Sequence, residues 1–118
     1  MSRRLYDVAI IQPGAFPTEM SQKIQAGSDA SVADEYKAIA DVPNKLFGAI
    51  GQMFETNKPN PQDVADAVIK LINLPKGQRP LRTVVDPSTG EIVKNVNDAI
   101  NVEYTKVLTA FGIEELLY

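Results

Sequence analysis

The 118-residue sequence contains neither cysteine nor histidine. Without cysteine there are no disulfides and no thiolate nucleophiles, and without histidine there is no imidazole to act as a general acid or base. A zinc site of the usual Cys/His type is excluded as well, and no metal site of another kind is predicted. No apolar run approaches the ~18 residues that a membrane span requires, so no contact with a membrane is expected.

A large net charge is also missing: the chain has 12 Lys and Arg and 15 Asp and Glu residues, which give a net charge of −3. A mildly acidic chain lacks the basic stripe of a nucleic-acid binder, so no nucleic-acid partner is expected. The basic start Met1–Arg4 is followed only by the short apolar run Val8–Ile11, which is too short for a signal peptide. We therefore expect a cytoplasmic protein whose residues 1–118 form a single domain.

Two short apolar runs are typical of strands. Tyr6–Ile11 ends in a Pro-Gly turn, and Leu81–Val85 lies between two prolines. Continuous apolar runs with such punctuation predict strands covered on both faces, as in parallel sheets. Because two strands alone do not make a stable sheet, both are expected to need neighbours.

Apolar residues recur at helical spacing elsewhere in the chain. The clearest case follows Asn60 and Pro61, which suit a helix cap and a first helical position, and ends before Pro75. Helices are predicted over 18–26, 32–41, 43–54, 61–74 and 98–111, with a turn at 88–90. The order of these elements predicts an α/β fold with two parallel strands and several helices.

The segment Val8–Thr18 resembles the short-chain dehydrogenase/reductase family. In that family a late strand of a Rossmann-type sheet ends in a Pro-Gly turn, and a threonine follows four residues after the glycine, as Thr18 follows Gly14 here. Pro61–Ala65 looks like the start of the family's helix before its last strand, and Pro80–Val85 looks like that last strand. The resemblance covers nearly all of this chain but only the C-terminal part of the family's domain, and it implies a C-terminal fragment of a Rossmann-type, doubly wound fold.

This resemblance implies hydride transfer between NAD or NADP and an alcohol or carbonyl compound. Pro13 and Gly14 would set the turn, Ala15 and Phe16 would offer backbone groups to the nicotinamide carboxamide, and Thr18 would offer its hydroxyl. The alternative is that the Pro-Gly pair merely ends a strand.

The segment Glu19–Asn57 looks like the family's substrate-binding lobe. An apolar substrate pocket could be lined by Met20, Ile24, Leu46, Phe47, Ile50, Met53 and Phe54. The alternative for these residues is a helix–helix core or a subunit contact. Lys76, Arg79 and Arg82 surround a turn and could reach a cofactor phosphate or a partner, or simply belong to a solvated loop.

The family's catalytic parts are missing from this sequence. It contains no glycine-rich pyrophosphate loop of the G-x-G-x-x-G kind and no Tyr-x-x-x-Lys pair, so no catalytic residue is assigned. We therefore expect the chain alone to be inactive and to bind no cofactor tightly. Its expected partner is either an N-terminal dinucleotide-binding half or a second copy of itself. The second possibility describes a free-standing, non-catalytic remnant that forms a homodimer; an unrelated small binding module is the third.

Overall fold

The computed structural model describes residues 6–117 and divides the chain into two compact units. One unit joins the N-terminal segment through Gly14 to the residues from Gln62 onward, and the other comprises Ala15–Pro61. The first unit therefore brings together the two segments in which strands are predicted, although they are separated by the whole second unit in the sequence.

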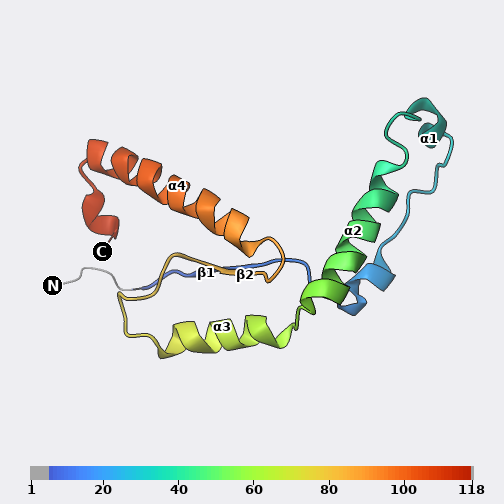
Figure 1. The fold of residues 1–118 in the computed structure, drawn as a ribbon. Helices are drawn as coiled ribbons and strands as arrows, with labels where there is room; N and C mark the ends of the chain where they lie inside the picture. The colour runs from blue at the N-terminus through green and yellow to red at the C-terminus, as the bar shows by residue number, and fades with distance from the viewer. Residues whose placement is uncertain (1–5, 118) are drawn as a thin grey trace. The chain divides into compact units, whose positions relative to one another are not determined.

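The first unit is built on two parallel strands. β1 (Ile10–Pro13) pairs with β2 (Arg82–Val85) so that Ile10 lies opposite Arg82 and Pro13 opposite Val85. Helix α3 (Gln62–Asn73) lies on one face of this pair and helix α4 (Gly90–Ala110) on the other (Figure 1). A 3₁₀ turn, η2 (Glu114–Leu117), follows α4. The predicted α/β arrangement with two parallel strands is confirmed.

β1 begins later than the sequence predicts, at Ile10 instead of Tyr6. The backbone ladder starts where Ile10 N–H donates to the Leu81 carbonyl (2.7 Å), one residue after Pro80. Asp7, which precedes the ladder, instead accepts hydrogen bonds from the Gly77 N–H (2.8 Å) and from Arg79 (2.9 Å). The first half of the predicted strand is thus fixed by side-chain contacts to the loop before β2.

Helix α3 follows the prediction closely, and Arg79 completes its C-terminal end. The guanidinium donates to the carbonyls of Leu71 (2.7 Å), Ile72 (3.2 Å) and Leu74 (2.8 Å) at and just after the end of the helix, where carbonyls lack the usual intrahelical donors, and it also pairs with Asp7. The interpretation of Arg79 as part of a solvated loop is therefore wrong, because its side chain is only 25% exposed. It ties the N-terminal segment to the end of α3.

Helix α4 begins at Gly90, eight residues before the predicted start at Asp98. The predicted turn precedes it, and the Asp86 carboxylate satisfies backbone donors of that turn by accepting from the N–H groups of Ser88 (2.8 Å) and Thr89 (3.2 Å). Asp86-Pro87 is therefore a helix-start signal that outweighs the low helix propensity of Gly90.

The second unit contains η1 (Glu19–Lys23), α1 (Val32–Glu35) and α2 (Val42–Asn57). The helix predicted over 32–41 stops at Glu35, since its apolar residues are exposed and no packing supports so short a helix. Helix α2 extends three residues beyond the predicted Phe54 and ends where Lys58 adopts a left-handed conformation (φ 46°) before Pro59.

The described part of the chain has a small core. Leu71 on α3, at 7% exposure, is the one large hydrophobic side chain that is buried among residues 6–117. Large apolar side chains on both α3 and α4 remain accessible, and the strands are half-buried at best. Within the same residues, no helix combines the length and the apolar character needed to cross a membrane.

Replacing Arg79 by methionine should destabilise the chain by about 2 kcal/mol, because the carbonyls at the end of α3 lose their charged donor and Asp7 loses its counter-ion. Urea unfolding followed by circular dichroism measures the change. Lys70→Met, on the exposed surface of the same helix, is the matched control and should leave the midpoint nearly unchanged. Equal effects of the two variants would show that Arg79 does not cap α3.

The Asp7 contacts also predict a pH dependence of stability. The Gly77 N–H, and after it the Arg79 guanidinium, lower the pKa of Asp7 below its ordinary value although its partial burial opposes this. Stability from this ionised carboxylate is complete above the pKa of the unfolded chain, about 4, and is lost as the pH falls through the lower folded value. Asp7→Asn should therefore reduce stability at pH 7 and flatten its decline in acid; an unchanged acid slope would contradict this assignment.

Candidate functional site

The carboxyl ends of the two parallel strands meet at the turn after β1. The N–H of Gly14 donates to the carbonyl of Val85 (3.0 Å), which extends the ladder by one residue beyond β1. The Asp86 side chain then lies directly against Gly14, so a Cβ on this residue would be only 2.6 Å from the Cβ of Asp86. Gly14 is thus required by a close approach between the two strand ends.

Asp86 is held in this position by three hydrogen bonds. Besides the two backbone donors of the turn, the Thr89 hydroxyl donates to its carboxylate (2.6 Å). Burial acts to raise the pKa of Asp86, but the hydrogen bonds from Thr89 and Ser88 outweigh it and lower the pKa overall. The ionised carboxylate is therefore held in one position, where it contacts both Gly14 and the turn that starts α4.

Gly90, the first residue of α4, also lies close to Asp86. A Cβ at Gly90 would lie 3.3 Å from both the Asp86 Cβ and a methyl group of Val84. Further along, the buried Asn97 of α4 donates from Nδ2 to Oε1 of Gln12 in β1 (2.7 Å). Both contacts hold α4 close to the carboxyl half of the strand pair.

The residues predicted to bind the cofactor fall into both units. Pro13 and Gly14 form the end of β1 in the first unit, while Ala15, Phe16 and Thr18 open the second. Phe16 is half-buried, whereas Ala15 and Thr18 are exposed. The Thr18 hydroxyl oxygen accepts from the Met20 N–H (3.3 Å) and caps η1, which leaves its proton available to an acceptor outside the chain.

The residues predicted to line a substrate pocket all lie in the second unit. Met20 and Ile24 are exposed at η1 and just after it, and Phe47 is exposed on α2. Ile50 and Phe54 are half-buried on the same helix. A shallow hollow of about 270 Å³ on α2 is lined by Ala49, Gln52, Met53, Thr56 and Asn57. Of the seven candidates only Met53 lines this hollow, and the role of the other six stays a prediction.

Sequence reasoning missed the contacts that hold the Pro-Gly turn in place. Nothing in the spacing of Gly14, Asp86 and Asn97 indicates that they meet, although Asp86-Pro87 does carry a capping signal. No group of three carboxylates that could hold a metal occurs among residues 6–117. A cavity of about 490 Å³ lies elsewhere, at the amino ends of the strands. It includes none of the residues predicted to bind the nicotinamide or the substrate, but it is lined by Arg79 and Arg82, which were predicted to reach a cofactor phosphate or a partner.

Comparison with known proteins adds no assignment, since no protein-family model, no curated protein and no solved structure matches this chain.

Replacing Gly14 by alanine should destabilise the chain by about 1–3 kcal/mol, because the new methyl group overlaps the Asp86 side chain. Gly48→Ala is the matched control, since this glycine lies in α2 with open space around it and should gain up to about 1 kcal/mol from helix propensity. Both changes can be measured by urea unfolding.

A double-mutant cycle isolates the contact itself. In an Asp86→Ala background the cost of Gly14→Ala should fall, because most of the overlapping atoms are gone. Equal costs in the two backgrounds would show that Asp86 does not constrain the turn.

Proposed function

We propose that this chain is the C-terminal part of an NAD(P)-dependent short-chain dehydrogenase/reductase, which transfers hydride between a nicotinamide and an alcohol or carbonyl compound. The proposal starts from the resemblance of Val8–Thr18 to that family. It includes the finer fold assignment, a fragment of a Rossmann-type doubly wound sheet, and a cytosolic location.

The observation that carries the proposal is the junction of the strand ends at Gly14. Ligands of doubly wound sheets bind beyond the carboxyl ends of the strands. Here the segment that leaves β1 is fixed by the Val85 carbonyl and the Asp86 side chain, and it leads to the exposed Ala15 and Thr18. Backbone groups and one hydroxyl with a free proton suit the amide of a nicotinamide, whose carbonyl accepts and whose NH₂ donates hydrogen bonds.

The cofactor, the residues of this chain and the dinucleotide-binding half have different roles in the proposed reaction. The nicotinamide, when bound, supplies the hydride chemistry. Pro13 and Gly14 fix the path of the backbone, while Ala15, Phe16 and Thr18 orient the ring. The proton donor and the pyrophosphate loop belong to a dinucleotide-binding half, so this chain alone binds no cofactor tightly.

The large exposed surface of this chain supports the proposal of a second, dinucleotide-binding half. The chain exposes 9811 Å², whereas two separate compact units of these sizes would together expose about 7,600 Å². Ile10 N–H and Gly14 N–H both donate to β2, so by the alternation of a strand the N–H of Ile11 points to the open side of β1. Neighbouring strands and helices of a larger sheet would cover these groups.

The second candidate is a non-catalytic chain that self-associates. It is favoured by the apolar residues Ile100, Tyr104 and Val107 of α4 and Phe111 directly after it, all of them at least 42% exposed. An apolar strip of this kind is typical of interaction surfaces, and a second copy would bury it.

The proposed function is tested on the reading frame that encodes this sequence. A glycine-rich loop and a Tyr-x-x-x-Lys pair should be encoded in the same frame or by a neighbouring one. The complete product should oxidise NADH or NADPH with a carbonyl substrate, and its kcat/KM should fall about 10–100-fold in Thr18→Val while Thr18→Ser retains most of it. Thr109→Val, on the exposed surface of α4, is the control. A complete product that neither binds nor consumes NAD(P)H would refute the proposal.

Self-association is tested on the 118-residue chain. Light scattering over a range of concentrations should give the mass of a dimer if the α4 strip is buried between copies, and Ile100→Lys should shift the mass toward the monomer because it places a charge in that strip. A monomeric mass throughout would contradict the second candidate.

A further inference from the structure

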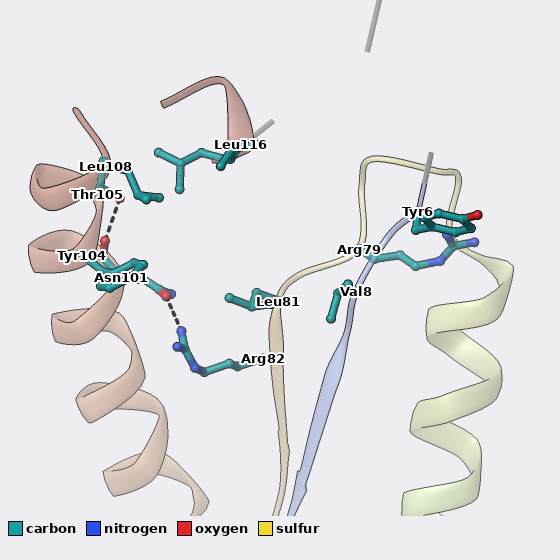
Figure 2. A pocket seen from close by; sticks show the side chains of 11 residues that line it. Tyr6, Val8, Arg79, Leu81, Arg82, Asn101, Tyr104, Thr105, Leu108 and Leu116 are labelled. Carbon is teal, nitrogen blue, oxygen red and sulfur yellow. Dashed lines mark hydrogen bonds between the residues drawn. The ribbon is translucent and has the colours of Figure 1, made fainter. Parts of the chain in front are cut away.

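A groove lies at the amino ends of the two strands, at the opposite end of the strand pair from Gly14. Its cavity of about 490 Å³ is bounded by the second half of α4, the turn η2 and the segments that lead into β1 and β2. Figure 2 shows Leu81 and Arg82 on one side, with Asn101, Tyr104 and Leu108 of α4 facing them and Leu116 above. All lining residues belong to the first unit, and we call this feature the amino-end groove.

The amino-end groove is lined by both aliphatic and polar side chains. Leu81, Leu108 and Leu116 supply aliphatic surface, and Leu81 and Leu116 are exposed to solvent. Asn101, Tyr104 and Leu108 stand at helical spacing on one side of α4, so a single helix face presents an amide, a phenol and a leucine. The volume lies in the range of small-molecule sites.

The groove also has a positive charge with no acidic partner. Arg79 is neutralised by Asp7 (2.9 Å). Arg82, in contrast, donates from Nη1 to the neutral Oδ1 of Asn101 (2.7 Å), and it forms no ion pair within residues 6–117. Among residues 6–117, no carboxylate lines the groove. In a chain of net charge −3, this groove is therefore complementary to an anion.

We propose that the amino-end groove binds an amphipathic carboxylate, a straight-chain fatty acid or a close analogue. Its carboxylate would pair with Arg82. The guanidinium of Arg82 is oriented by its hydrogen bond to Asn101 and still has further N–H groups that can donate to a ligand. Its alkyl chain would lie on Leu81, Leu108 and Leu116. The groove shares no residue with the proposed nicotinamide or substrate site, although Arg79 and Arg82, which line it, are also candidates for contact with a cofactor phosphate.

The proposal is tested by titrating the 118-residue chain with sodium decanoate below its micelle concentration, followed by ¹H–¹³C NMR. We expect saturable one-to-one binding with shifts of the Leu81, Leu108 and Leu116 methyl groups. Shortening the acid should weaken binding by up to about fourfold per methylene, the value of a buried CH₂. Decanol and decyltrimethylammonium test the head group, and both should bind at least tenfold more weakly than decanoate.

Variants test the assigned contacts. Arg82→Gln should weaken decanoate binding about tenfold or more, because the charged hydrogen bonds to the carboxylate are lost. Arg82→Lys should retain most of the affinity, and Lys94→Gln, which removes a positive charge elsewhere on α4, should have no effect. The amide NMR spectrum of each variant shows that it is folded.

Four results would overturn the proposal. Equal binding of decanol and decanoate, or an unchanged affinity in a folded Arg82→Gln variant, would show that no carboxylate is recognised. Methyl shifts that depend on protein concentration without any acid would show that a second copy occupies the groove. Absence of saturable decanoate binding would show that the groove is not a ligand site.

Discussion

The structure of the first unit depends on the Asp86 carboxylate. This one side chain accepts hydrogen bonds from the turn that starts α4 and occupies the space where a side chain of Gly14 would be. It therefore couples the end of β1 to the end of β2 and to a helix on one face of the pair. The turn after β1 is thereby fixed as far as Gly14, the last residue of β1's side of the first unit.

A second constraint is the shortage of buried apolar surface. Leu71 is buried and Arg79 closes the end of α3, yet apolar side chains on both helices remain open to solvent. Two parallel strands are too few to cover these surfaces, and each strand also has one unpaired edge of backbone N–H and C=O groups. The fold of the first unit is thus organised by polar contacts at the strand ends, namely Asp7 with Arg79 at one end and Asp86 with Thr89 at the other.

The sequence predicts the elements better than it predicts their contacts. The parallel strands and α3 could be found because apolar spacing, Pro-Gly punctuation and capping residues are local signals. The start of α4 was missed because Gly90 has low helix propensity, although Asp86 overrides it by capping the turn. The 85-residue separation of Asn97 from Gln12 and the 72-residue separation of Arg79 from Asp7 lie beyond any periodic pattern, so these contacts had to be seen in the structure.

The two ends of the strand pair differ in a way that bears on function. At the carboxyl ends, glycine and hydrogen-bonded carboxylate make a tight junction in which backbone groups are the exposed chemistry. At the amino ends, α4 and η2 leave a cavity of about 490 Å³ with leucines and an arginine that forms no ion pair within residues 6–117. Near the carboxyl ends, α4 approaches Val84 and Asp86 through Gly90 and bonds Gln12 through Asn97. Near the amino ends, Asn101 of α4 is linked to β2 by the long side chain of Arg82. Packing a helix tightly at one end of a short sheet therefore leaves room for a ligand at the other, and the free charge of Arg82 determines which ligands suit it.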